Sequence, residues 1–335
     1  MRVNRATLLK IANDTIKRSA RQDRSIFAAY LCGSLLGDRY LIGGTTDIDL
    51  TFIHTGPVEE PREIIRLTDE IHLDIAHYDQ KSFRDPRQLR VDPWLGPTIF
   101  DCQVLYDPQH FIDFTQASVR GQFHRADYVL ERSRMGVDTA RKIWFAFYRD
   151  VPATPCAADI LEYLKALKHA VNGVVSLGSA PLTDRGLALN FADRSVVLGY
   201  PGLHPGLLGL LGAPQVTPEE LSGWVGDWQQ AYEAQATDNG LCNLHLHRLH
   251  YYLHAIESLI TRQNPENALW PLFYTWTQAI TQLHEDAKYH EPWDRAGQQL
   301  GLLGAEFAER ITALDAYLDS VEEILEKYAR ANGVE

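Results

Sequence analysis

The sequence predicts an α+β fold, in which a small mixed sheet with helices is followed by an all-helical domain. Short apolar runs with the alternation or the turn boundaries of β-strands occur only in the first third of the chain. From residue 115 onward these strand signals nearly vanish, and apolar residues recur at helical spacing. The 335 residues suit two domains, because one domain usually takes about 100–200 residues. We place the domains at residues 1–114 and 115–335.

The charge of the chain is acidic and unevenly distributed. The net charge is −12. Residues 1–115 hold 14 Lys and Arg against 17 Asp and Glu, a net of −3, whereas residues 116–335 hold 18 against 27, a net of −9. Binding to a nucleic acid needs clustered Lys and Arg to neutralise phosphates. The composition therefore argues against a nucleic-acid partner and favours a neutral or cationic one.

The cysteines and the hydropathy indicate the compartment. Four cysteines, Cys32, Cys102, Cys156 and Cys242, lie far apart with no Cys-x-x-Cys pair, so we expect free, buried thiols in a reducing cytoplasm. We find no apolar segment of a signal peptide and no run of about 18 apolar residues. The expectation is a soluble, cytoplasmic protein that does not associate with membranes.

The first domain is expected to alternate strands with helices. Its first helix follows from Leu8, Ala12 and Ile16, which recur at helical spacing, and from Asn4, which is a suitable N-cap. A further short helix is expected to begin at Ser34. Apart from this short helix, the predicted helices are residues 4–20 (the first helix), 61–70 and 93–101. The predicted strands are residues 26–31, 47–53, 71–79 and 103–106.

The strand at residues 47–53 carries two carboxylates. Side chains in a strand alternate between its faces, so Asp47 and Asp49 must project from the same face. Neighbouring carboxylates repel each other, and a divalent cation relieves this repulsion. Carboxylate and phosphate oxygens are the ligands that Mg²⁺ prefers. The pattern predicts a Mg²⁺ site at Asp47 and Asp49.

A Gly-Ser turn precedes this strand. Gly33 has no Cβ, so a phosphate can approach its backbone closely. Ser34 stands where a short helix can begin, and N–H groups at a helix start attract anions. An anion cradle, a short helix and a strand with paired carboxylates together describe a site for a metal and a nucleoside triphosphate.

These residues resemble the signature of the DNA polymerase β-like nucleotidyltransferase superfamily. That signature places Gly-Ser before a short helix and Asp-x-Asp on the next strand, as Gly33-Ser34 and Asp47-Ile48-Asp49 do here. Thr46 stands where the signature often carries a serine. A strand that ends at Asp107-Pro108, followed by a helical domain, is similar to aminoglycoside nucleotidyltransferases. The resemblance is specific over residues 26–77 and concerns layout alone over the helical half.

The resemblance implies a third carboxylate on the next core strand, and Asp74 is the matching residue. Within residues 71–79, Asp74 shares a face with His72, and the apolar residues face the other way. Asp74 would then ligate the metal or accept the proton of the acceptor. We interpret His72 as a packing residue in preference to one that orients Asp74.

The resemblance also implies the chemistry. A nucleoside monophosphate, AMP from ATP, would be transferred to a hydroxyl group of a small molecule. Two Mg²⁺ ions would be held by Asp47, Asp49 and Asp74, while Gly33 and Ser34 would hold the phosphates. The helical domain would select the acceptor, and an acidic cleft would suit a cationic aminoglycoside, which would make the protein an antibiotic-resistance enzyme.

The second domain is expected to be a set of helices divided by one loop. Residues 198–214 contain five glycines and three prolines, so we predict a loop there. Thr217 is a suitable N-cap, with Pro218 at the first helical position and Glu220 placed for a capping box. The predicted helices cover residues 115–149, 157–177, 217–236, 241–263, 266–287 and 305–331.

Two groups of polar residues in this domain could be functional. His247, His250 and His254 share one helical face at a spacing found in metal sites, but leucines surround them, so we interpret them as packing or cleft-lining residues. In enzymes that the chain resembles, a lysine or arginine of the helical domain often contacts the triphosphate. The candidates are Lys142, Lys165 and Lys168.

Three alternatives remain open. The chain could transfer nucleotides to a protein or a tRNA, although its acidic charge weighs against RNA. It could be a binding or regulatory module with an inactive site, which the intact carboxylates oppose. It could also be a toxin–antitoxin component whose helical half binds a partner. The identity of the acceptor, the preferred nucleotide and the oligomeric state do not follow from the sequence.

Overall fold

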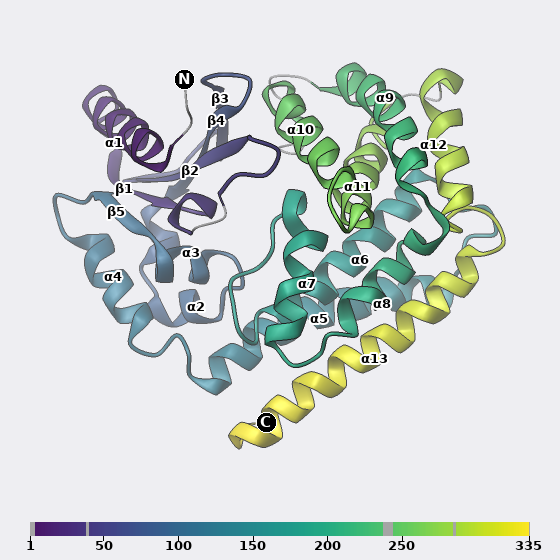
Figure 1. Ribbon diagram of the computed structural model, residues 1–335. Coiled ribbons are helices and arrows are strands. Elements are labelled where there is room, and N and C mark those ends of the chain that lie inside the picture. The colour runs from purple at the N-terminus through teal and green to yellow at the C-terminus, as the bar shows by residue number, and fades with distance from the viewer. Residues whose placement is uncertain (1–3, 38–39, 237–243, 284–285, 335) are drawn as a thin grey trace. The chain divides into compact units, whose positions relative to one another are not determined.

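The computed structural model describes residues 4–37, 40–236, 244–283 and 286–334 (Figure 1). The chain divides into two compact units, Met1–Tyr128 and Val129–Glu335. The first combines a sheet with helices and the second is helical, which confirms the predicted fold class. Residue 114, where the sequence analysis placed the boundary, lies within helix α4 (Phe111–Arg120). Helix α4 packs on other helices of the first unit, so it belongs to that unit.

The sheet of the first unit has five strands in the order β3-β4-β2-β1-β5. Strands β2 and β4 run parallel, and the other neighbours are antiparallel, so the sheet is mixed as predicted. Because β2 and β4 run in the same direction, their first residues lie at the same edge of the sheet. The strands are β1 (Ile26–Cys32), β2 (Thr46–His54), β3 (Arg62–Arg66), β4 (Ile71–Asp79) and β5 (Gln103–Tyr106).

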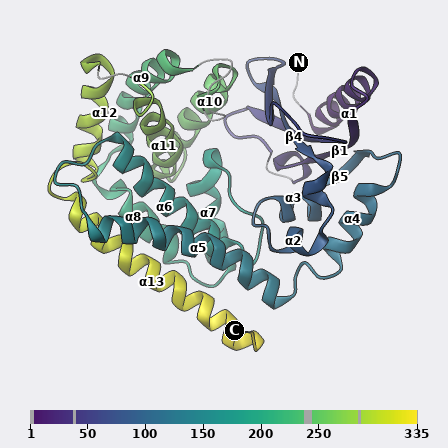
Figure 2. The same ribbon diagram turned by 180° about the vertical axis from the view of Figure 1, so that it is seen from behind.

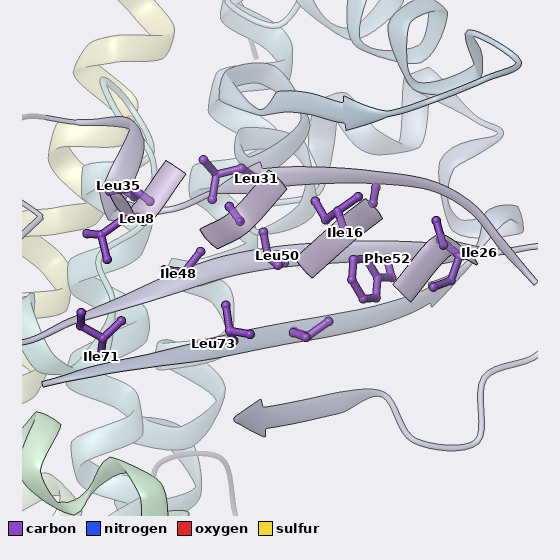
Figure 3. Close-up of a cluster of buried hydrophobic side chains, with 14 residues drawn as sticks. Leu8, Ile16, Ile26, Leu31, Leu35, Ile48, Leu50, Phe52, Ile71 and Leu73 are labelled. Atoms are coloured by element: carbon purple, nitrogen blue, oxygen red, sulfur yellow. The ribbon is translucent and has the colours of Figure 1, made fainter. Parts of the chain in front are cut away.

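One face of the sheet packs on helix α1 (Arg5–Gln22). The Asn4 side chain accepts a hydrogen bond from the N–H of Thr7, which confirms the predicted N-cap. Figure 3 shows Leu8 and Ile16 of α1 together with the strand residues of this cluster. The labelled strand side chains are Ile26, Leu31, Ile48, Leu50, Phe52, Ile71 and Leu73. Burying these alternate residues fixes which way every other side chain of β2 and β4 must point.

The opposite face packs on helices α2 (Pro86–Val91), α3 (Leu95–Asp101) and α4. Tyr30 and Cys32 of β1 point to this face and lie in a second apolar cluster with residues of the three helices. Helices α2 and α3 lie between β4 and β5 in the chain, α4 follows β5, and the three helices lie together in the ribbon (Figure 1). Helices therefore cover both faces of the sheet, and its polar side chains must lie at the parts of the faces that the helices leave uncovered.

The helix predicted for residues 61–70 is wrong, because residues 62–66 form the edge strand β3. This strand pairs antiparallel with β4, with Ile64 opposite Asp74. Ile64 is buried and Ile65 is half-buried, so two adjacent isoleucines fit a strand edge as well as a helical face. Pairing with β4 satisfies the backbone polar groups of this short segment, and β-branched residues favour that outcome.

The second unit consists of helices (Figure 2). Thr217 forms the predicted capping box with Glu220. The longer helices are α5 (Ala126–Arg149, which begins at the end of the first unit), α6 (Ala157–Val175), α7 (Leu187–Val197), α8 (Leu203–Leu210), α9 (Pro218–Gln235), α10 (Leu249–Ile260), α11 (Leu269–Ile280), α12 (Ala287–Gln299) and α13 (Phe307–Asn332). Short 3₁₀ helices are η1 (Ser34–Leu36), η2 (Gln80–Phe83), η3 (Asp184–Gly186), η4 (Ala213–Gln215), η6 (Leu246–Arg248) and η7 (Pro265–Ala268).

The loop predicted for residues 198–214 is wrong, because it contains helix α8. Pro205 lies in the first turn of α8, where a proline interrupts no helical hydrogen bond. Gly206 faces the ring of Tyr317 on α13, and a Cβ there would lie 3.1 Å from a ring carbon. Gly206 thus allows α8 to pack closely on α13. Helices α7 and α12 were not predicted, and the start of the helix predicted for residues 241–263 lies outside the described residues.

The cysteine prediction holds in part. Cys32, Cys102 and Cys156 are free thiols, and Cys242 lies outside the described residues. Cys32 and Cys102 are buried as expected, but Cys156 is exposed, because it stands at the N-cap of α6. Within the described residues, we find no helix that is both long enough and apolar enough to cross a membrane.

Candidate functional site

Strand β2 positions two carboxylates on one face of the sheet. Ile48 and Leu50 are buried against α1, so Asp47 and Asp49 must point to the opposite face. Asp47 is buried and Asp49 is half-buried. Both stand near the start of β2, and rigid strand backbone carries both side chains. Their separation therefore depends little on the conformation of loops.

Strand β4 adds the third carboxylate. In the parallel pair β2–β4, Asp49 lies opposite Asp74, and Asp47 lies opposite His72. Paired residues of neighbouring strands point to the same face, so Asp74 joins the side of the two β2 carboxylates. Asp74 is only 3% exposed. One oxygen from each of Asp47, Asp49 and Asp74 can be chosen so that all three lie within 4.8 Å of one another.

This arrangement fits a hard divalent cation. The donors are carboxylate oxygens, which Mg²⁺ prefers, and two oxygens on one Mg²⁺ lie at most about 4.2 Å apart, because each bond is about 2.1 Å long. The separations of up to 4.8 Å come within a small side-chain rotation of that limit. Three acids at this distance repel one another, and a bound cation would remove the repulsion.

Gly33 stands directly against Asp49. It follows Cys32, the residue paired with Asp49 across β1 and β2. Its φ of 76° lies in the left-handed region, and a Cβ built on it would lie 2.6 Å from Cγ of Asp49. Any residue larger than glycine would therefore displace this carboxylate. The predicted Gly-Ser turn and Asp-x-Asp strand are in direct contact.

The short helix predicted at Ser34 is a single 3₁₀ turn, η1. Its hydrogen bonds run from Leu36 N–H to the carbonyl of Gly33 and from Gly37 N–H to the carbonyl of Ser34. The N–H groups of the first residues of such a turn have no carbonyl partner within the turn. Ser34 is exposed, so its hydroxyl is open to a ligand.

Arg62, which was not among the residues predicted for the site, is part of it. Its guanidinium donates to both oxygens of Asp74, from Nε to Oδ1 and from Nη2 to Oδ2, each at 2.6 Å. Arg62 stands opposite Ala76 on β4, so it shares the face of the carboxylates. Reading residues 61–70 as a helix hid this contact. Arg62-Glu63-Ile64 read as a strand next to 71–79 would have placed a cation beside Asp74.

Cys32 and Tyr30 of β1 point to the same face of the sheet as the carboxylates. Burial raises the pKa of the Cys32 thiol, and the negative charge of Asp49 raises it further. Burial likewise raises the pKa of Tyr30 well above its ordinary value. Both therefore stay protonated at neutral pH. His72 is also buried, on the same face.

The candidate residues of the helical unit have local partners. Lys165 pairs with Glu162 at 2.7 Å, and Lys168 pairs with Asp184 at 2.6 Å. Lys142 is exposed. Lys168 also lies over the ring of Tyr274, with its nitrogen 5.6 Å from the ring centre. Of the three predicted lysines, Lys168 is the one that lies among aromatic and acidic groups.

The three histidines lie around the start of α10. His247 is in η6, and the rings of His250 and His254 on α10 are 5.7 Å apart. His247 donates its backbone N–H to Nδ1 of His245, whose ring is 4.8 Å from that of His247. These contacts tie the histidines to one another and to the local backbone.

Comparison of the chain with models of known protein families gives no match, and comparison with curated protein sequences gives none either.

Proposed function

We propose that the protein is a Mg²⁺-dependent nucleotidyltransferase of the DNA polymerase β-like type. It transfers a nucleoside monophosphate, AMP from ATP, to a hydroxyl group of a small molecule. The observation that supports this proposal most directly is the convergence of Asp47, Asp49 and Asp74 from two parallel strands. The contact between Gly33 and Asp49 supports it further, because it brings a turn suited to phosphates against the carboxylates.

Each residue has a stated role in this proposal. Asp47 and Asp49 hold two Mg²⁺ ions, with Asp74 as the third ligand. Such ions neutralise the charge of the triphosphate and favour both the attacking and the leaving oxygen. The open backbone at Gly33 and the hydroxyl of Ser34 bind the phosphates through hydrogen bonds. Burial of Asp47 and Asp74 keeps their side chains in fixed positions.

The reaction is an in-line displacement at the α-phosphorus. The acceptor oxygen forms a bond to this phosphorus, the bond to the bridging oxygen breaks, and pyrophosphate leaves with the bonding electrons. The proton of the acceptor hydroxyl passes to a base, which is a solvent molecule or a carboxylate of the site. We assign Asp74 to the metal, because three crowded carboxylates are best relieved by cations.

The acceptor in this proposal is a cationic small molecule of the aminoglycoside kind. The supporting observation is the charge of −9 over residues 116–335. An attraction between exposed opposite charges is largely screened beyond a Debye length of about 8–10 Å, and this length shortens as salt increases. Acceptor affinity should therefore fall as salt increases, and an affinity that ignores salt would point to a neutral acceptor.

The proposal is tested by release of pyrophosphate from ATP with Mg²⁺, in the presence of a panel of aminoglycosides, lincosamides and nucleotides. ATP labelled at the α-phosphate should transfer its label to the acceptor, whereas label from the γ-phosphate should not. Asp47→Asn and Asp49→Asn should each lower the rate by about a thousand-fold or more. Asp69→Asn, at an exposed turn, is the control and should keep the wild-type rate. Wild-type rates in either site variant would refute the assignment.

A further inference from the structure

Asp74 is a buried charge that already has a cationic partner. Its side chain is only 2% exposed, and the guanidinium of Arg62 occupies both of its oxygens. A carboxylate buried this deeply is stable only when its charge is compensated. In the protein without metal, Arg62 supplies this compensation through a bidentate pair, the strongest geometry that a side chain offers.

The two partners differ in their freedom to move. The side chain of Arg62 is 47% exposed, whereas Asp74 is enclosed between β3 and β2. Arg62 is the first residue of the edge strand β3, so only one side of its backbone is paired. The half-exposed guanidinium can move into solvent at little free-energy cost, whereas the side chain of Asp74 is buried. If the pair opens, Arg62 is the residue that moves.

We propose that Arg62 is the resting counter-ion of Asp74 and competes with the divalent metal for this carboxylate. This inference rests on the proposed function, since it concerns the same metal site. A guanidinium and a divalent cation on one carboxylate repel each other at close range. Metal binding is therefore coupled to release of Arg62. The metal binds to Asp74 only when its binding free energy offsets the loss of the Arg62–Asp74 ion pair.

Strand β4 offers a second position for the released guanidinium. On the face of Asp74, the next side chains are Ala76 and Tyr78. Ala76 lies opposite Arg62 and has a small side chain. Tyr78 is 37% exposed. Burial raises the pKa of Tyr78, and the positive charge of Arg62 opposes this rise.

The test measures binding of Mn²⁺ alone, by titration calorimetry without nucleotide. Arg62→Gln removes the charge but keeps a polar side chain. It should bind Mn²⁺ more tightly than wild type, by about fivefold or more, because one competing cation is gone. Arg66→Gln is the matched control: Arg66 lies on the same strand but pairs with Asp69, so its loss should leave the affinity unchanged. In an Asp74→Asn background, Arg62→Gln should have no effect on Mn²⁺ affinity.

The outcomes separate this inference from the proposed function. If wild type binds Mn²⁺ and Arg62→Gln binds it equally or more weakly, competition is refuted while the metal site stands. If neither protein binds Mn²⁺, this inference falls, whereas the proposed function is decided separately by release of pyrophosphate from ATP. Circular dichroism establishes that each variant is folded. If Arg62→Gln does not fold, Arg62→Lys replaces it. A lysine keeps the charge but loses the bidentate geometry, so competition predicts tighter Mn²⁺ binding for this variant too, and unchanged binding would overturn it.

Discussion

Asp49 on β2 and Asp74 on β4 are register partners in the parallel strand pair near the middle of the sheet. Register partners point to the same face, and both flanks of each strand are paired to neighbours. The separation of the two carboxylates is therefore set by the sheet. Such placement gives a site the rigidity that catalysis requires.

The contact between Gly33 and Asp49 predicts that Gly33→Ala disables the site. An added Cβ would collide with the Asp49 side chain, and the backbone at φ 76° and ψ −159° is strained for alanine by about 1–3 kcal/mol. We expect a lower free energy of unfolding and loss of metal-dependent nucleotide binding, measured by denaturant titration and calorimetry.

Gly44→Ala is the matched control for this substitution. Gly44 has a similar φ of 78°, but nothing lies within 4 Å of a Cβ built there. It should show the backbone strain alone and keep nucleotide binding. Equal effects of the two substitutions on binding would show that the contact with Asp49 does not matter.

Asp74→Asn should weaken activation by Mg²⁺. Asparagine has nearly the same shape as aspartate but lacks the charge that holds a cation, so the metal titration of activity should move to higher concentration. If Asp74 were the base instead, the metal dependence would stay unchanged, and the rate would fall by about a hundred- to ten-thousand-fold with loss of the acidic limb of the pH–rate profile. That second pattern would contradict our assignment of Asp74.

The pair His54–His77 predicts a loss of stability in mild acid. Nε2 of His54 and Nδ1 of His77 share a hydrogen bond of 2.9 Å, which needs one nitrogen without a proton. Burial, together with the neighbouring charge of His54, lowers the pKa of His77 to about 4. The unfolded chain takes up this proton below about pH 6.5, whereas the folded protein does so only near pH 4. Stability is therefore full above pH 6.5 and falls as the pH drops towards 4.

His77→Gln should remove this part of the acid sensitivity. The free energy of unfolding of wild type should decrease between pH 6.5 and 4 by about 2–3 kcal/mol more than that of the variant. His110→Gln is the control: Asp113 raises the pKa of the exposed His110, so its small contribution is lost as the pH rises, in the opposite sense. Parallel pH profiles of wild type and His77→Gln would contradict the account of this pair.

Arg141 is expected to stabilise the helical unit through a group of ion pairs. From α5 it reaches three acids of α13: Asp315 at 2.5 Å, Asp319 at 2.8 Å and Glu322 at 2.7 Å. Its guanidinium also lies 4.8 Å from the centre of the Trp144 ring. Arg141→Met would leave the acids to repel one another, and we expect a loss of about 1–3 kcal/mol in the free energy of unfolding.

The control for Arg141 is Lys327→Met. Lys327 makes a single exposed pair with Glu323 on the same helix, which is worth about 0.5 kcal/mol or less. High salt should reduce the difference between wild type and Arg141→Met, because screening weakens the repulsion among the acids. If the two substitutions cost the same, the cluster around Arg141 adds nothing beyond an ordinary surface pair.

The sequence predicted the strands of the site because their signals are local. Ile48 and Leu50 alternate with Asp47 and Asp49, and this period of two decides which face each side chain takes. The same rule placed Asp74 away from the core, and the parallel pairing of β2 with β4 then brings it to Asp49. The resemblance to nucleotidyltransferases implied a third carboxylate on the next core strand, whereas the parallel pairing of the two strands is seen only in the structure.

The features that the sequence did not reveal depend on contacts between distant segments. The strand β3 is stabilised by pairing with β4, and only that pairing brings Arg62 to Asp74. Helix α8 looked like a loop because its glycines and prolines weaken a helix, but Gly206 is needed where the helix meets Tyr317. Local propensity gave the wrong answer at both places because tertiary packing outweighs it.

The central claim is that Asp47 and Asp49 bind a metal with a nucleoside triphosphate, and binding of a non-hydrolysable ATP analogue tests it most directly. The measurement is titration calorimetry of wild type and of the double variant Asp47→Asn/Asp49→Asn, each in Mg²⁺ and in EDTA. We predict saturable binding to wild type in Mg²⁺, weaker by about tenfold or more in EDTA and in the double variant. Equal affinity under all four conditions, or no binding to wild type in Mg²⁺, would contradict the claim.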